Sequence, residues 1–405
     1  MRLLLVNQHY PPDSGATGRV LAELAEALAA RQHGVRVITG KPTYQEAQGV
    51  DAPWSEEKNG VQIERVPMLP RQTSRLGRML HYASFACGLF FRGLTLPRPD
   101  AVVAFSSTPF LGGVALRMLA FAKRCPYVYV VQDAYPEIAV ALGALSPGFV
   151  ERIAAQFERW VWSGASRVVV IGAELVSLAE ARGVDPSRVA VIPNWADAER
   201  IVPQDISSFR RELGFQEDDF VVEYAGNLGQ AQALEGVLEA ARLVAKERRP
   251  IRFLFVGEGS SADSFRQRAS SVPGVTVAPF QPEERLPDVL AAADVGLVPL
   301  KRGLSRYCVP SKVYSILASG RAVGAAVDDG SDIARLVNEA DCGFRVDPDD
   351  PEGLAAEILR LADDRDQVRD MGRRARKFCE EEATLERAAE RYEDVLSGAI
   401  VNQGP

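Results

Sequence analysis

The chain has 405 residues, of which 47% are hydrophobic and 25% are charged, and its formal net charge is −7. This length and composition are typical of a globular protein with two domains. The negative charge excludes a generally basic nucleic-acid-binding protein, because such a protein needs a positive surface against the phosphate backbone.

The N-terminus and the cysteines indicate a cytosolic protein. The chain opens with a short apolar run that soon meets Pro11–Pro12, which predicts a β-strand rather than a signal peptide. No apolar run is long enough to span a bilayer. The cysteines are dispersed without C-x-x-C spacing: Cys87, Cys125, Cys308, Cys342 and Cys379. They are typical of reduced thiols, and the scattered His9, His33 and His81 predict no metal site.

Short β-branched runs alternate with longer amphipathic stretches in both halves of the chain. The strands expected in the first half are Leu3–Val6, Val35–Thr39, Ala101–Phe105, Tyr127–Val131, Arg167–Ile171 and Val189–Ile192. The strands expected in the second half are Phe220–Ala225, Arg252–Val256, Val275–Ala278, Val295–Val298, Ala322–Ala326 and Gly343–Val346. Helical spacing covers Gly18–Arg31, Leu234–Lys246 and Ser311–Ser319. This alternation predicts an α/β protein with two doubly wound parallel sheets, hence two Rossmann-like domains.

A polar stretch at Asn194–Ser208 marks the expected domain boundary, because the strand series restarts after it. We therefore expect an N-terminal domain at residues 1–200 and a C-terminal domain at residues 201–383. A last helix within residues 384–405 can return to the N-terminal domain.

The segment from Arg71 to Arg98 has no acidic residue and mixes arginines with large apolar side chains. Its arginines are Arg71, Arg75, Arg78, Arg92 and Arg98, and its apolar residues include Met79, Leu80, Phe85, Leu89, Phe90 and Phe91. This mixture favours a peripheral helix on an anionic membrane. A buried core helix with a few surface arginines is the alternative.

Two glycine-rich turns follow expected strands of the second half. The first contains Gly226, Asn227, Gly229 and Gln230, and the second contains Gly257 and Glu258. Glycines let the backbone approach a ligand closely, and the helix that follows the first turn offers free N–H groups to a diphosphate. Ligands of open α/β sheets bind at this end of the strands. Simple structural turns are the alternative for both.

A third feature, from Pro299 to Gly320, brings cations to the same expected edge. Its cations are Lys301, Arg302, Arg306 and Lys312, and Ser311 is an expected helix N-cap, with Ser315 one turn later. Lysine in a first helical turn opposes the helix dipole unless an anion is bound, so Lys312 favours a diphosphate partner. A solvated lysine is the alternative. Ser331 and Asp332 open a later helix and either contact sugar hydroxyls or simply cap it.

At these residues the sequence resembles glycosyltransferase family 4, of the GT-B fold. The resemblance rests on Tyr10–Pro12 with Gly15 and Gly18, on Ile192–Asp197, on Tyr224–Gly229, and on the P-S-K motif within Pro310–Gly320. It implies two Rossmann-like domains facing across a cleft, with the donor between them. The D-A-Y-P-E run at Asp133–Glu137, together with Asn194–Trp195, is similar to bacterial O-antigen and capsule amino-sugar transferases, including N-acetylfucosamine transferases.

The resemblance also implies the chemistry. It suggests a UDP-linked N-acetylated amino sugar as donor, a lipid-diphosphate-linked glycan as acceptor, retention of anomeric configuration, no metal and no further cofactor. It implies a cytoplasmic protein that is peripheral at the inner face of the plasma membrane. The sequence departs from the family where many members carry two glutamates, because Tyr307 and Ser315 stand there. Gln230 likewise replaces a lysine of many relatives.

The expected mechanism stabilises charge on the leaving diphosphate, which requires fixed donors and cations. Lys312, Arg302 or Arg306, and the loop amides of residues 227–229 are the candidates. On the acceptor side, Gly15 and Gly18 let the N-terminal loop approach the sugar. Arg19 can reach an acceptor phosphate, with a helix surface charge as the alternative. Asp133 and Glu137 are candidates for binding acceptor hydroxyls or assisting proton transfer, with helix capping as the alternative for Asp133.

Three other functions share this architecture. A sugar-nucleotide epimerase needs an acid/base set flanking the sugar, and none of the three histidines is well placed for that role. A phosphorylase needs a pyridoxal-bearing lysine in a far longer chain. A non-catalytic nucleotide-sugar-binding subunit, inactive because it lacks the glutamates, stays open.

Overall fold

The computed structural model describes residues 1–13, 15–42, 52–70, 74–106, 111–205 and 207–401. The chain folds into two compact units. One comprises Met1–Pro193 together with the segment from Leu385 onward, and the other comprises Asn194–Thr384. The chain therefore passes between the units at 193/194 and 384/385, whereas the sequence suggested a first boundary at 200/201. Among the described residues, no helix combines the length and apolarity needed to cross a bilayer.

The first unit is built on a mostly parallel sheet with the strand order β3-β4-β2-β1-β5-β6-β7-β8. Its strands are β1 Arg2–Val6, β2 Gly34–Gly40, β3 Ser55–Lys58, β4 Val61–Val66, β5 Ala101–Phe105, β6 Tyr127–Val131, β7 Arg167–Val170 and β8 Val189–Val191. β3 alone runs antiparallel to its neighbour, β4. β5 and β6 are buried along their whole length, as strands covered by helices on both faces must be.

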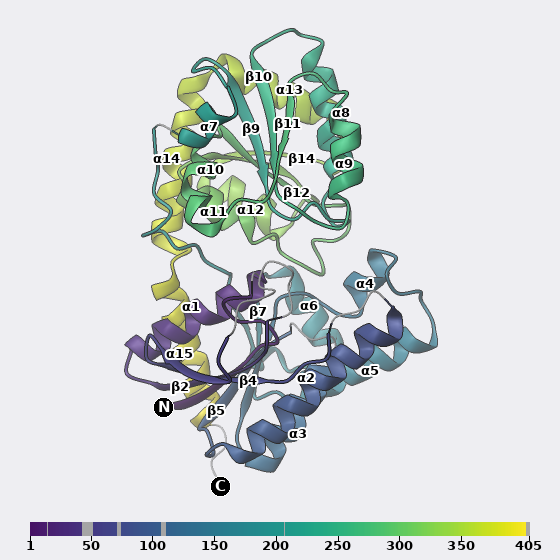
Figure 1. Cartoon of the computed structure of the whole chain (residues 1–405), viewed down its shortest axis with the longest axis vertical. Coiled ribbons are helices and arrows are strands. Elements are labelled where there is room, and N and C mark those ends of the chain that lie inside the picture. Colours follow the sequence, from purple (N-terminus) through teal and green to yellow (C-terminus); the bar gives the residue numbers. More distant parts are fainter. Residues whose placement is uncertain (14, 43–51, 71–73, 107–110, 206, 402–405) are drawn as a thin grey trace. The chain divides into compact units, whose positions relative to one another are not determined.

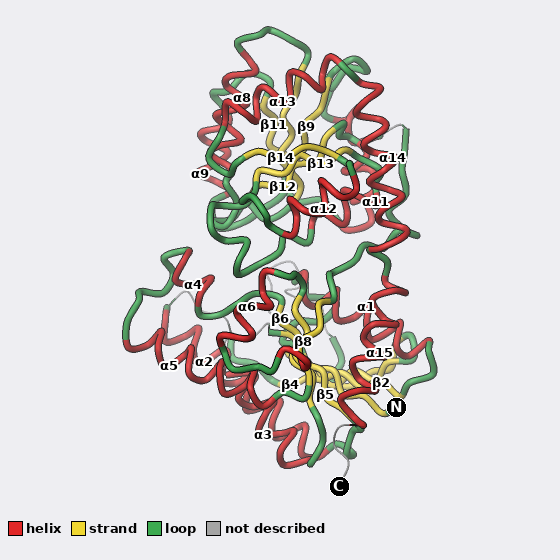
Figure 2. The backbone as a smooth tube through the Cα atoms, turned by 180° about the vertical axis from the view of Figure 1, so that it is seen from behind, coloured by secondary structure: helices red, strands yellow, loops and turns green. Residues whose placement is uncertain are grey.

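Helices cover both faces of this sheet. They are α1 Ala16–Ala30, α2 Arg75–Thr95, α3 Leu111–Lys123, α4 Glu137–Ala141, α5 Phe149–Gly164, α6 Glu174–Ala181 and α15 Leu385–Val401. α1 and α15 pack together on one face, while α2, α3 and α5 form a layer on the other (Figures 1 and 2). Glu393 of α15 ties the last helix to α1, because its carboxylate contacts Arg31 Nε at 2.7 Å and His33 Nε2 at 2.6 Å.

The second unit has a fully parallel sheet with the order β11-β10-β9-β12-β13-β14. Its strands are β9 Phe220–Ala225, β10 Ile251–Val256, β11 Val275–Ala278, β12 Val295–Pro299, β13 Ala322–Ala326 and β14 Gly343–Val346. Its helices are α7 Ser208–Glu212, α8 Leu234–Ala245, α9 Ala262–Ala269, α10 Leu286–Ala291, α11 Lys312–Ala318, α12 Asp332–Ala340, α13 Pro351–Asp363 and α14 Arg365–Glu382. Alternate residues of β9 face opposite layers: Val222 and Tyr224 join α8 and α13, whereas Val221 joins α7 and α10.

The structure confirms the twelve strands expected from sequence, most of them within a residue, and adds the hairpin of β3 and β4. The hairpin turns at Asn59 and Gly60, whose φ values are 49° and 77°. Positive φ at both positions suits a two-residue turn of the Asn-Gly type. The expected helices also appear, as α1, α8, α11 and α15.

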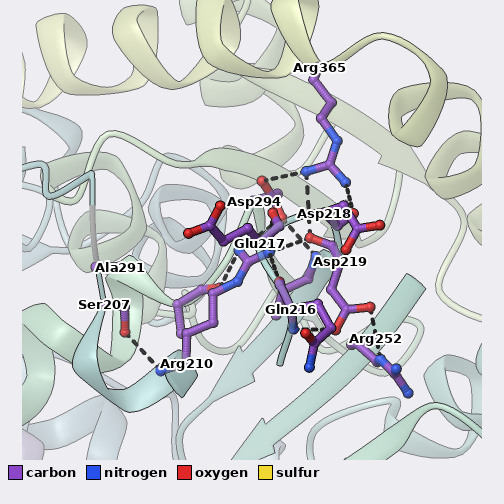
Figure 3. Close-up of polar contacts among 12 residues, drawn as sticks. Ser207, Arg210, Gln216, Glu217, Asp218, Asp219, Arg252, Ala291, Asp294 and Arg365 are labelled. Carbon is purple, nitrogen blue, oxygen red and sulfur yellow. Dashed lines mark hydrogen bonds and ion pairs between the residues drawn. The ribbon is translucent and has the colours of Figure 1, made fainter. Parts of the chain in front are cut away.

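Ion pairs and hydrogen bonds join the amino ends of the strands in the second unit (Figure 3). We call Arg210, Asp219, Arg252, Asp294 and Arg365 the amino-edge network. Asp294 lies 3.5 Å from Arg210 and 3.6 Å from Arg365, and its carboxylate also accepts the Val221 amide at 2.7 Å. Asp219 is fully buried and accepts from Arg252 at 3.1 Å. Each carboxylate therefore has a partner of opposite charge.

Candidate functional site

The carboxyl edge of the second sheet has the geometry of a ligand site. β9 and β12 lie side by side at its centre, and the chain leaves β9 toward β10 on one side and β12 toward β13 on the other. The loops that follow β9 and β12 therefore diverge, and ligands of open α/β sheets bind where such loops diverge. The backbone joins them there, because the amide of Lys301 donates to the carbonyl of Ala231 at 2.9 Å.

The two glycine turns at this edge pack directly against each other. Gly226 and Gly257 both have a φ of 148°, a conformation that side chains rarely adopt. A Cβ on Gly257 would lie only 2.0 Å from the carbonyl oxygen of Gly226, so no larger residue fits. The amide of Leu228 donates to the carbonyl of Glu258 at 2.8 Å and is occupied by the fold. Of the three expected loop amides, those of Asn227 and Gly229 find no acceptor among the described residues.

Lys312 begins α11, as expected, and its ammonium group lies against the first glycine turn. Nζ lies 3.7 Å from the centre of the Tyr224 ring and 3.2 Å from the point at which a Cβ on Gly226 would stand. The residue is partly exposed, but Nζ itself is buried and has no hydrogen-bond partner in the described chain. This burial lowers the pKa of Lys312 to about 7, because the charged form loses its hydration.

Of the other cations on the loop after β12, some are engaged and some are not. Arg302 is exposed and pairs with Asp349 at 3.4 Å. Lys301 and Arg306 are exposed, and within the described residues their side chains have no ion pair. The loop itself is fixed, because Asp328 accepts from the amide of Gly303 at 2.7 Å. The structure thus leaves Lys301 and Arg306 more available to an anion than Arg302.

Several expected donor contacts already have partners. Ser331 is buried, and its hydroxyl accepts the amide of Ala334 at 3.2 Å, so it caps α12. Asp332 pairs with Arg335 at 2.5 Å, and Glu258 pairs with Arg266. Ser311 precedes α11 without forming a side-chain cap. The remaining two, Gln230 and Ser315, are exposed and half-buried respectively.

On the first unit, the expected acceptor residues lie at the carboxyl end of β1. A Cβ on Gly18 would lie 2.9 Å from the carbonyl of His9, so this glycine lets α1 pack on the loop rather than opening space for a sugar. A Cβ on Gly15 would meet the His9 side chain at 3.3 Å. Arg19 is half-buried and lies 3.7 Å from Glu23 one turn later on α1.

Asp133 and Glu137 follow β6 but have different surroundings. Burial alone raises the pKa of Asp133 to about 6, which suits a group that exchanges a proton near neutrality. Glu137 pairs with the buried Arg182 at 2.6 Å. Arg182 also lies 3.8 Å from Glu158 and stacks on Trp162 at 4.1 Å, so Glu137 belongs to a structural cluster.

No motif of the sequence marks a functional histidine, yet His9 forms a close pair with Asp13. His9 Nδ1 lies 2.8 Å from Asp13 Oδ2, and Asp13 is buried. A carboxylate on one ring nitrogen orients an imidazole so that the other nitrogen can exchange a proton. The spacing of four residues was visible in the sequence, but only the fold of the loop after β1 brings the two side chains together.

Together, the residues at the second sheet's carboxyl edge can hold a dianion. Within the described part of the chain, they supply two amides without an acceptor, the Lys312 ammonium group without a hydrogen bond, and two exposed cations. Such groups bind diphosphate and stabilise its developing charge without a base.

Comparisons with known proteins cover both units. Residues 15–195 match the family described as Glycosyl transferase 4-like domain, and residues 219–364 match Glycosyl transferases group 1. The chain is 30% identical to the Escherichia coli K12 protein described as Putative colanic acid biosynthesis glycosyl transferase WcaI, over 88% of this chain and 91% of the relative. It is 31% identical to the Probable glycosyltransferase WbjE of Pseudomonas aeruginosa, over 66% of this chain and 67% of the relative.

Among solved structures, the chain is similar to the crystal structure of Anabaena Alr3699/HepE in complex with UDP and glucose. The TM-score is 0.73 at 17% identity, with 98% of this chain and 99% of that chain covered. A likeness at this identity concerns the fold, and it confirms the GT-B class expected from the sequence.

Proposed function

The chain belongs to the group 1 glycosyltransferases, and from this membership we propose that it transfers a sugar from a UDP-sugar to a glycan of bacterial surface polysaccharide, with retention of configuration. The leaving UDP is held at the carboxyl edge of β9 and β12. The relatives WcaI and WbjE are described as glycosyltransferases, the first of colanic acid biosynthesis, and the HepE structure contains UDP.

One observation carries the proposal: the ammonium group of Lys312 is buried between Gly226 and the Tyr224 ring, with no hydrogen bond or ion pair to any described residue. Burying a cation without a counter-charge is unfavourable, so such a group normally persists where a ligand supplies the charge. A diphosphate that lies over the glycine turn would pair with Lys312 and accept from the amides of Asn227 and Gly229. Arg306 would reach the same anion from the surface.

The leaving diphosphate gains charge as the glycosidic bond breaks, and these groups stabilise that charge. For a retaining transfer, the acceptor hydroxyl attacks from the face that the diphosphate leaves, and a phosphate oxygen takes its proton. Asp133 and Glu137 are proposed on the acceptor side. Because Arg182 already binds Glu137, Asp133 is the better candidate for contacting an acceptor hydroxyl.

The finer substrate assignment is an N-acetylated amino sugar as donor and a lipid-diphosphate-linked glycan as acceptor. It rests on the D-A-Y-P-E run, on Asn194–Trp195 and on the P-S-K motif at Pro310–Lys312. We propose a cytoplasmic protein at the inner face of the plasma membrane. Within the basic segment, α2 exposes Met79, Leu80 and Phe91 but buries Phe85 and Leu89 against the sheet. Arg71 lies outside the described residues.

The test is a thermal-shift panel with UDP, GDP, ADP and several UDP-amino sugars, followed by UDP release with and without glycan acceptors. A ligand that binds only the folded state raises its melting temperature in proportion to occupancy. We expect UDP and one UDP-amino sugar to stabilise the protein, and UDP release to require an acceptor. Stabilisation by GDP or ADP instead would refute the donor assignment.

A second candidate function is a non-catalytic nucleotide-sugar-binding subunit. The observation in its favour is that Tyr307 and Ser315 supply no carboxylate where many relatives carry one. Donor binding without UDP release on any acceptor would favour this reading over catalysis.

A further inference from the structure

Helix α5 carries a row of large apolar side chains on its outer face. Phe149 is 78% exposed and Val150 is 63% exposed, and Ile153, Phe157 and Trp160 continue the row. A spacing of three to four residues places 149, 153, 157 and 160 on a single helical face. A row of this size on a globular surface usually marks an interaction site.

The opposite face of α5 is firmly attached to the first unit, so the apolar row cannot turn inward. Ala154, Glu158, Val161 and Trp162 are buried. The indole of Trp162 donates to Glu158 at 2.8 Å, and Arg182 stacks on the same indole. This buried cluster fixes the rotation of the helix, and the outward position of Phe157 and Trp160 follows from it.

The charges of the outer face are positive. Its exposed polar residues are Arg152, Gln156 and Arg159, whereas Glu158 is buried and Glu151 is only partly exposed. Arg117 of α3 stacks on the exposed Trp160 at 4.1 Å and adds a further cation. Arginines between aromatic residues suit an anionic lipid surface, where the rings enter the boundary of the acyl chains and the guanidinium groups meet phosphates.

The neighbouring helices extend this character. α2, α3 and α5 form one layer and together contain seven arginines and lysines but two glutamates, in a chain whose net charge is −7. On α3, Phe121 is 85% exposed. Phe121 also lines a cavity of about 520 Å³ together with Arg117 and Arg124. The cavity also includes Gly164, so it lies beside the C-terminal end of α5.

We propose that the outer face of α5 docks onto an anionic bilayer, with Phe149, Phe157 and Trp160 in the interface and Arg152 and Arg159 on lipid phosphates. A second copy of the chain is a poorer occupant, because a symmetric contact would bring the same arginines together without exposed acids to pair with them. The inference deepens the membrane location of the proposed function, which placed the contact on residues 71–98. The inference rests on the proposed function only in one respect, because that function gives membrane binding its biological purpose.

The experiment is co-sedimentation of the full chain with vesicles of phosphatidylcholine alone or mixed with phosphatidylglycerol. We expect binding only to the mixed vesicles. The Phe149→Ser/Phe157→Ser variant should bind them at least tenfold more weakly, because each substitution removes a large apolar side chain from the bilayer contact. The matched control is Phe280→Ser, which removes a half-exposed phenylalanine of the second unit and should leave binding unchanged. Arg75→Glu/Arg78→Glu tests the α2 segment in parallel.

Tryptophan emission gives a local readout. Brominated lipid should quench the unmodified chain and the Trp54→Phe variant but not Trp160→Phe, since Trp162 and Trp195 are buried. Equal vesicle binding by Phe149→Ser/Phe157→Ser and the unmodified chain would overturn the proposal. So would loss of binding only in the α2 variant, or an unmodified dimer that the α5 variant dissociates without any vesicle binding. UDP release on the same samples separates this failure from failure of the proposed function.

Discussion

The two edges of the second sheet differ in how their charges are compensated. At the amino edge, Asp219 and Asp294 each have an arginine partner, and Arg210 also donates to four carbonyl groups (Figure 3). At the carboxyl edge, Nζ of Lys312 is buried without a hydrogen bond, and Arg306 is exposed without an ion pair, among the described residues. The same strands thus end in a satisfied network on one side and in an incomplete one on the other.

This difference separates stability from function within a single sheet. A network whose charges are all paired gains nothing from a ligand, so its purpose is to hold the strands and the flanking α7 and α14 in place. An incomplete set of amides and cations is less stable alone and becomes complete when an anion binds. Substitutions at the two edges should therefore affect different measurements.

The largest expected effect is on catalysis, from Lys312→Met. Loss of a preorganised charge at a leaving group typically costs about 2.7–4 kcal/mol of transition-state stabilisation, so kcat/KM for UDP-sugar should fall by about 100- to 1000-fold. Folding stability should stay equal or rise, because the unpartnered amine is removed from a buried place. The control is Lys246→Met at the exposed end of α8. An unchanged kcat/KM in Lys312→Met would contradict the assignment of the carboxyl edge to catalysis.

Next comes stability, from Arg210→Met at the amino edge. The substitution removes one of the two arginines beside Asp294 and the donor to four backbone carbonyl groups, and we expect a loss of about 2–3 kcal/mol in the free energy of unfolding. Denaturant unfolding measures it. Arg249→Met removes the exposed pair with Asp363 and should cost less than about 1 kcal/mol. UDP affinity of folded Arg210→Met should match that of the unmodified chain, and a large loss there would contradict the separation.

The pH dependence of UDP binding gives a third measure. Because the pKa of Lys312 is lowered to about 7, the ligand-free amine is mostly neutral above that pH. A bound diphosphate favours the charged form, so binding above pH 7 takes up a proton, and Kd should rise by up to about tenfold per pH unit. Titration calorimetry between pH 6 and 9 checks this. The Lys312→Met variant should lose the dependence; if it keeps it, another group titrates.

The sequence predicted the buried strands well, because runs such as Tyr127–Val131 are apolar on both faces whatever surrounds them. The hairpin of β3 and β4 was not predicted, because Ser55–Lys58 is polar and only the Asn59–Gly60 pair marked the turn. An Asn-Gly pair is itself a hairpin signal, and it does not depend on a neighbouring apolar run.

The candidate site was predictable in position but not in state. The glycine turns and the P-S-K motif located Lys312 at the carboxyl edge. Its burial depends on the ring of Tyr224 and the backbone of Gly226, which are far away in sequence and meet it only in the fold. For the same reason, the sequence did not distinguish Arg302 from Lys312 as a candidate cation. In the structure, Arg302 pairs with Asp349.

The smallest predicted effect comes from Arg302, and comparing it with Arg306 tests the difference between paired and unpaired cations at the carboxyl edge. Arg302 is 57% exposed and Asp349 is 66% exposed, so their pair is solvated and contributes little. Arg302→Gln should change kcat/KM by less than about twofold, whereas Arg306→Gln should lower it by about fivefold, the value of an exposed charge contact of about 1 kcal/mol. Steady-state UDP release on both variants decides between them. If Arg302→Gln has the larger effect, the ion pair with Asp349 opens when the donor binds, and the carboxyl edge holds one more unsatisfied cation than the ligand-free structure displays.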